Sequence, residues 1–487
     1  MAEVSQSAEI ETSCDVSIAI QNDPTSMEQG TMPEQKILKV PHQLLKEMVE
    51  VSQLTETDTS GQVSIAIQND RPSLEQNLIL AWPSQKILKV PRQLLEVNRK
   101  AYEPYVISIG PYHRCKDHLK EMEEQKVPSL KRLLQSTNQS VEIYLSAIGD
   151  MVKEARNCYS GPLDISEEEF IEMMVLDGCF IILFFTGMLG DSFCCNGLIY
   201  SSILHDLVLV ENQLPFFVLY KLFDMIPKTF FNLVGSTDPK NWFIHQLLEK
   251  FEDRMPGLRV NTTYDDSSMK NVKHIVHLLH SNWLPSNEAM DEYNHHPKDG
   301  KWRLIRSATE LREAGIEFKR LETGRDARKS LFDIKFYNKI LAIPTVTIDV
   351  DTESLLRNLI VFEQYDNKHP LFLTAYIALM DPLINSVKDV ELLCKSGIID
   401  NLLGNDESVA ALFNGFGNHI SFSRQDFFYA QLFKDINRYY GTPWSKWTAN
   451  LRHKYFKTPS AFVSFLAATL LLLLTLLQTA FTIFPRP

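Results

Sequence analysis

The sequence has little glycine, an excess of negative over positive charge, and no paired cysteines. Glycine makes up 19 of 487 residues and aromatic residues 10%, a balance that favours a helix-rich interior over a turn-dense β-sandwich. Basic residues number 49 against 61 acidic ones, a net charge of −12, which disfavours nucleic-acid binding. The seven cysteines form no CxxC pair, which argues against a disulfide framework or a zinc module and favours a reducing compartment.

Sequence motifs of the common enzyme and cofactor classes are also missing. The chain contains no G-x-S-x-G, no G-x-x-x-x-G-K-[ST], no H-E-x-x-H and no dinucleotide-binding fingerprint, so these reactions lack their usual local geometry. We therefore predict no catalytic residue, no metal ligand and no cofactor, and we favour a protein that is not an enzyme.

Two polar segments are the only candidates for an active site. The loop Tyr112–His118 holds two histidines and a cysteine, at a spacing that matches no standard zinc pattern, and loop packing is the simpler interpretation. Glu211–Gln213 interrupts an apolar run just before Pro215, where its side chains are expected to satisfy backbone groups. An enzyme remains possible only if the two segments converge into a pocket.

Two further clusters resemble metal ligands but have simpler interpretations. Three histidines step by three residues along the predicted helix Lys270–His280, close enough for two of them to share a metal, although a helix edge near the surface is favoured. Three alternating acidic residues resemble the start of a calcium loop, but its glycine and distal glutamate are missing, so capping of the following helix is favoured. These residues are His274, His277 and His280, and Asp349, Asp351 and Glu353.

The C-terminal segment Ala461–Phe484 contains 24 residues without a charge, which as a helix would extend about 36 Å. This length predicts a transmembrane helix with the lipid bilayer as its partner. Basic residues precede the segment and only Arg486 follows it, so the bulk of the chain is predicted to be cytosolic. The acidic N-terminus shows no signal peptide. Together these features predict a tail-anchored, single-pass protein in the plasma membrane or an endomembrane.

Residues 1–85 are predicted to be a flexible leader that carries a partial tandem duplication. Val16–Gly30 recurs with few changes as Val63–Asn77, and Lys36–Leu45 recurs as Lys86–Leu95. Two copies are too few for a stacked repeat architecture. Polar spacers rich in Ser, Thr, Gln and Glu surround the copies, as is typical of flexible segments.

Residues 86–457 are predicted to form a mainly α-helical globular domain, ahead of the span at 461–484 and a short tail at 485–487. Ser386 and Asp389 provide a capping signal for a helix over Val387–Leu393. The apolar run Cys179–Leu189 is too short to cross a bilayer and is expected to be a core helix. Strands are expected at Val106–Ile109 and in a small β element over residues 330–349, with a hairpin turn at Asn338-Lys339.

Several motifs in fixed order resemble one plant family, catalogued as domain of unknown function 247. They include VPRQLLEVNRKAYEPYVISIGPYHR, DGCFIILFF, DLVLVENQLPFFVLYKLF, ATELREAGIEF, FDIKFYNKILAIPTVTIDVDTESLLRNLIVFEQ and GIIDNLLGNDESVAALFN. The resemblance extends from about Lys86 to the C-terminus. It implies a plant source and a mostly helical domain tethered to a membrane.

The leading hypothesis is a tail-anchored membrane protein whose helical domain acts as an interaction or signalling module with protein partners. The alternative is a membrane-tethered enzyme of unrecognised class, which would use the Tyr112-His113 loop together with Glu211–Gln213.

Overall fold

The computed structural model describes residues 86–190, 196–231, 238–260, 264, 269–321, 330–366, 370–417, 421–442 and 459–483. The predicted leader at 1–85 and the tail at 485–487 therefore lie outside the described residues. Of the duplicated segments, only Lys86–Leu95 falls inside them.

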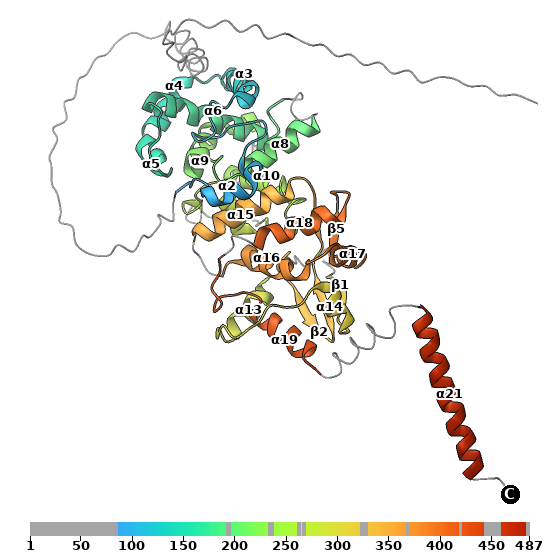
Figure 1. The fold of residues 1–487 in the computed structure, drawn as a ribbon. Helices are drawn as coiled ribbons and strands as arrows, with labels where there is room; N and C mark the ends of the chain where they lie inside the picture. Colours follow the sequence, from blue (N-terminus) through green and yellow to red (C-terminus); the bar gives the residue numbers. More distant parts are fainter. Residues whose placement is uncertain are drawn as a thin grey trace, which may run out of the picture.

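In the first half of the described chain, all the helices and strands named by their bounds are helices. Its elements are α2 (Arg92–Asn98), η2 (Arg99–Tyr102), η3 (Asp117–Leu119), α3 (Lys120–Thr137), α4 (Val141–Gly149), α5 (Val152–Asn157), α6 (Glu167–Phe185), α8 (Gly197–Leu207), α9 (Phe216–Met225), η4 (Lys228–Phe231) and α10 (Pro239–Glu249). Figure 1 shows that α3 to α10 gather at one end of the body.

Helix α6 is the centre of that end. It begins at a capping box, in which Ser166 Oγ accepts the Glu169 N–H at 3.1 Å and the Glu169 carboxylate accepts the Ser166 N–H. Every residue from Met173 to Phe185 is buried, and α3, α4 and α9 pack against it. The predicted core helix is therefore confirmed as far as Phe185, and the last residues of the apolar run follow the helix end.

The second half mixes helices with two small sheets. Its helices are α12 (Ile275–Asn282), α13 (Asn287–His295), α14 (Ala308–Glu313), α15 (Thr352–Asp366), α16 (Phe372–Leu383), α17 (Val387–Lys395), α18 (Asp406–Phe416), α19 (Ala430–Tyr440) and α21 (Pro459–Ile483). Its strands are β1 (Glu317–Arg320), β2 (Lys335–Tyr337), β3 (Ile340–Ile343), β4 (Val346–Ile348) and β5 (Ile399–Asn401). Helices α15 and α16 lie between the α6 end and the three-stranded sheet (Figure 1).

The three-stranded sheet has the order β1-β3-β2, so β2 is an edge strand. Strands β2 and β3 form an antiparallel hairpin, and β1 pairs with β3 in parallel. The predicted turn at Asn338-Lys339 is confirmed, because both residues adopt positive φ angles, 47° and 66°, as a tight hairpin turn of this kind requires. Strands β4 and β5 form a separate parallel pair.

The sequence also predicted the start of α17 correctly. Asp389 Oδ2 accepts the Ser386 N–H at 2.9 Å and the Ser386 hydroxyl at 2.7 Å. This contact satisfies a backbone donor at the start of the helix, where no earlier helical carbonyl can do so.

The prediction of a strand at Val106–Ile109 is wrong. This segment lies outside the five strands of the described chain, and its amide groups donate to side chains instead of to a neighbouring strand. The alternation of residues indicated an extended backbone, but it could not show which groups the backbone would bind.

The prediction of a transmembrane helix at Ala461–Phe484 is also wrong. The segment does form a helix, α21. However, none of the helices in the described part of the chain combines the length and the apolar character that crossing a bilayer requires. The sequence argument relied on the length of the segment and on its lack of charge, whereas hydroxyl and amide side chains interrupt the segment and leave Leu470–Leu474 as its longest unbroken apolar run.

Candidate functional site

The segment Tyr105–Gly110 is held by carboxylate and amide side chains from two helices and the loop after α8. Asp206 of α8 accepts the N–H groups of Tyr105, Val106 and Ile107 at 2.7 to 2.8 Å. Asn212 Oδ1 accepts the Ile109 N–H at 2.7 Å, and Asp177 of α6 accepts the Gly110 N–H at 2.8 Å. These side chains replace the hydrogen bonds that a sheet would have supplied.

A buried lysine completes this network. Lys126 of α3 is 1% exposed, and its ammonium group donates to Asp177 at 2.6 Å, to Glu123 at 2.5 Å and to the Ser108 carbonyl at 2.5 Å. All three ammonium protons therefore have acceptors, as a buried charge requires. We call Lys126, Asp177, Asp206, Glu211, Asn212 and Gln213 the polar joint.

The two candidate segments of the enzyme hypothesis do meet in this joint. His113 Nε2 lies 3.3 Å from Glu211 Oε2, without hydrogen-bond geometry, and neither ring nitrogen of His113 has a hydrogen-bond partner in the described structure. Burial lowers the pKa of His113 to about 3. Burial also raises the pKa of Glu211, whose Oε1 accepts the Val90 N–H at 2.6 Å.

The convergence of these segments is therefore confirmed, and His113 is buried where they meet. His113 is 4% exposed, and neither of the two cavities described below is lined by His113 or Glu211. The interpretation of Glu211–Gln213 as a backbone-satisfying joint is confirmed, since Gln213 Nε2 donates to the carbonyls of Leu207 and Leu209 at 2.8 and 2.9 Å.

The three histidines of the possible metal cluster surround a phenylalanine. The rings of His274, His277 and His280 each lie 5.2 to 5.3 Å from the ring of Phe362. His280 also contacts Glu363 at 3.1 Å, and burial lowers the pKa of His274. Within the described ranges, no group of three or more His, Cys, Asp or Glu side chains is arranged to hold a metal ion.

The acidic cluster is used to begin α15. Asp349 Oδ1 accepts the Thr352 N–H and hydroxyl at 2.9 and 2.7 Å, while Asp351 pairs with Arg254 at 3.0 Å. Glu353 accepts hydrogen bonds from Asn98 and Arg357, both at 2.8 Å. The capping interpretation is therefore confirmed for Asp349, and the other two carboxylates tie distant segments to the helix.

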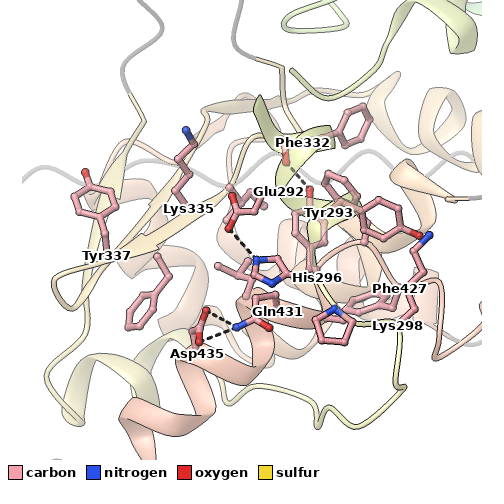
Figure 2. Close-up of a pocket in the computed structure, with 18 of the residues that line it drawn as sticks. Glu292, Tyr293, His296, Lys298, Phe332, Lys335, Tyr337, Phe427, Gln431 and Asp435 are labelled. Atoms are coloured by element: carbon pink, nitrogen blue, oxygen red, sulfur yellow. Dashed lines mark hydrogen bonds and ion pairs between the residues drawn. The ribbon is translucent and has the colours of Figure 1, made fainter. Parts of the chain in front are cut away.

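A cavity of about 200 Å³ lies between α13, β2 and α19. We call it the aromatic cavity. Its buried aromatic lining comes from Tyr293, Phe332, Phe427, Phe428 and Tyr429. Figure 2 shows labelled side chains from all three elements arranged around it.

Charged groups of both signs surround the aromatic cavity, and each contacts a neighbour. His296 lies 3.8 Å from Glu292, and the Lys298 ammonium lies 4.5 Å from the centre of the Tyr293 ring. Lys335 pairs with Glu288 at 3.2 Å. Such exposed contacts contribute little to stability, and they place charged groups of both signs at the rim.

The edge of a strand forms one wall of the aromatic cavity. Ile334 and all three residues of β2 line it. Successive side chains of a strand point to opposite faces of the sheet, so a cavity that touches consecutive residues lies along the edge of the strand and not over one face. Among the strands of the described residues, β2 has one neighbour, β3.

The sequence analysis did not predict the aromatic cavity. Its walls come from α13, from β2 and from the start of α19, which are separated by tens of residues along the chain. The available signal was the aromatic density of FDIKFY (332–337) and FFYAQLF (427–433), but such runs usually fill cores.

A second, much smaller cavity of about 30 Å³ is lined by residues that include His205, Arg254 and Asp351. Its volume holds little more than a water molecule. His205 is fully buried, its Nδ1 contacts Asp206 at 2.9 Å and its ring stacks on Tyr105, while its Nε2 has no partner in the described structure.

Comparison with protein-family models gives a match over residues 87–474 to domain of unknown function 247, described as a plant protein of unknown function. The chain belongs to this family. Domain of unknown function 247 thus covers nearly all of the described body, including the polar joint and the aromatic cavity.

Two curated relatives, both from Arabidopsis thaliana, support this assignment. The UPF0481 protein At3g47200 is 29% identical over 413 residues, covering 80% of this chain and 84% of the relative. The putative UPF0481 protein At3g02645 is 24% identical over 472 residues, covering 78% of this chain and 86% of the relative. No solved structure matches the chain.

Proposed function

We propose that this member of the family is an interaction module that binds an extended segment of a partner protein at the aromatic cavity. The observation that carries the proposal is the position of the cavity along the edge of β2. A strand edge offers backbone donors and acceptors to an added strand, and an adjacent pocket provides selectivity for a side chain of that strand.

The size and lining of the cavity favour a side chain as the occupant. At about 200 Å³ it is smaller than typical sites for cofactors and drug-sized ligands, which measure roughly 300–1,000 Å³. Aromatic walls favour an aromatic or branched aliphatic anchor, because ring contacts add to the gain from buried area. The charged groups of both signs at the rim could form ion pairs or hydrogen bonds with polar residues on either side of such an anchor.

The test is selection of peptides from a random displayed library on the full-length protein. We expect a consensus with one large apolar residue in a sequence of high strand propensity. Ala289 of α13 lines the cavity, so the larger side chain of Ala289→Phe should fill the cavity. The affinity of the selected peptides should then fall by at least about tenfold. Ala411 is an exposed residue of α18, and Ala411→Phe is the matched control that should leave binding unchanged.

Two results would contradict the proposal. One is a set of selected peptides without a shared apolar anchor. The other is a peptide that binds the Ala289→Phe and Ala411→Phe proteins equally well, because its site then lies elsewhere. A circular dichroism melt of both variants separates loss of the site from loss of the fold.

The alternative function, an enzyme, has one supporting observation, the contact between His113 and Glu211. Its geometry is less favourable, because a histidine that is 4% exposed offers little surface to a substrate. The interaction module is therefore the better-supported proposal.

A further inference from the structure

The second copy of the duplicated segment, Lys86–Leu95, is bound to the body at a well-defined site. Ile87 pairs with Tyr159 in a parallel bridge. The Ile87 N–H donates to the Cys158 carbonyl at 2.6 Å, and the Ile87 carbonyl accepts the Ser160 N–H at 3.1 Å and the Tyr112 hydroxyl at 3.0 Å. We call Tyr112, Cys158–Ser160 and Glu211 the acceptor site.

The remaining contacts of the second copy involve positions that the first copy shares. Val90 is 5% exposed and donates its N–H to Glu211 at 2.6 Å, while the Lys89 ammonium lies 5.1 Å from the centre of the Tyr112 ring. Leu94 and Leu95 pack against the core. Residues of the body therefore hold this copy in place.

The first copy, Lys36–Leu45, offers the same groups in the same order. KILKVPHQLL and KILKVPRQLL differ only at His42 and Arg92, and Arg92 is exposed. Every side chain that contacts the acceptor site is therefore present twice in the chain. We propose that the first copy is a second occupant of the acceptor site and exchanges there with the second copy of the same molecule.

Tether length determines which copy predominates. Ala101 is the fixed point from which both tethers are counted. It is buried, and its carbonyl accepts hydrogen bonds from Ser354 and Asn358 of α15. The second copy ends six residues before Ala101 and the first copy ends fifty-six residues before it. Effective concentration falls with roughly the −3/2 power of tether length, which favours the second copy by roughly 30-fold. The first copy should thus occupy the site in about one molecule in thirty.

Disulfide trapping in the full-length chain tests this proposal. The parallel bridge at Ile87 and Tyr159 places Lys86 beside Cys158 on the neighbouring segment, and paired strands lie within disulfide reach. Lys86→Cys should trap the second copy on Cys158, and Lys36→Cys should trap the first copy on the same thiol. Ser52→Cys is the control, because it lies in the leader outside the duplicated segment and nearer to the body along the chain.

Peptide mapping by mass spectrometry reports the rate at which each introduced cysteine forms a disulfide bond with Cys158. We expect Lys36→Cys to be trapped roughly 30-fold more slowly than Lys86→Cys but at least about fivefold faster than Ser52→Cys. Val90→Ala weakens the binding of the second copy to the acceptor site and leaves the first copy unchanged. It should therefore increase trapping of the first copy. Trapping of Lys36→Cys no faster than Ser52→Cys, with and without Val90→Ala, would overturn the proposal. Disulfide bonds of Lys36→Cys that form only between different molecules would also overturn it.

Discussion

The anchoring of Tyr105–Ile107 by one carboxylate makes Asp206 the most informative position for a stability measurement. Asp206 is fully buried, and its two oxygens accept three consecutive backbone N–H groups and contact His205 Nδ1. Truncation in Asp206→Ala removes all of these acceptors at once. The three amide groups cannot form a ladder with a neighbouring strand instead, because the segment belongs to neither of the two described sheets.

The expected loss follows from the burial of each donor. The Ile107 amide is buried, so losing its charged partner should cost about 1.5–3 kcal/mol. The Tyr105 and Val106 amides are partly buried and can bind water after truncation, at a cost of about 0.5–1.5 kcal/mol each. Asp206→Ala should therefore lower the free energy of unfolding by about 2.5–6 kcal/mol. Asp206→Asn keeps one acceptor oxygen and should lose about half as much.

The assay is equilibrium urea denaturation followed by circular dichroism, with hydrogen exchange at Tyr105, Val106 and Ile107 as a local readout. Glu391→Ala is the control, since Glu391 is an exposed carboxylate paired with Lys395 one helical turn away. This substitution should change the free energy of unfolding little. A loss below about 1 kcal/mol for Asp206→Ala, or unchanged exchange at the three amides, would refute the reasoning. The segment would then be held by its apolar side chains alone.

Three further predictions concern the backbone and the buried histidine. Gly110→Ala should destabilise the fold by about 2 kcal/mol or more in the same denaturation assay, because Gly110 has a φ of 72° and a Cβ there would lie 2.6 Å from the Gln213 carbonyl oxygen; a neutral effect would contradict this. Lys339→Gly should raise stability by about 0.5–1 kcal/mol, because its φ of 66° favours glycine; a lower denaturation midpoint would show that the Lys339 side chain matters more. The folded-state pKa of His113 is lowered to about 3, so the unfolded chain binds this proton first and stability should fall as pH decreases from about 6.5 towards 3. His113→Gln should flatten that slope, and an unchanged slope would assign it to other groups.

The sequence predicted local features well where a few neighbouring residues determine the structure. The Ser386–Asp389 capping signal and the Asn338-Lys339 turn each depend on residues within one turn of the chain, and both are confirmed. The strand expected at Val106–Ile109 failed because its backbone partners, Asp206 and Asn212, lie about a hundred residues away. The aromatic cavity was missed for the same reason, since its walls come from three distant segments.

The polar joint shows why polar residues in an apolar run do not by themselves indicate catalysis. The side chains of Asp206, Asn212 and Gln213 are directed to backbone groups, and Lys126 has acceptors for its three protons. A catalytic group must keep at least one functional atom available to a substrate. Next to the joint, His113 and His205 each have at least one ring nitrogen without a hydrogen-bond partner in the described structure, but both side chains are buried. Access, more than residue type, therefore separates the polar joint from the aromatic cavity, and it is the reason for placing the binding function at the cavity.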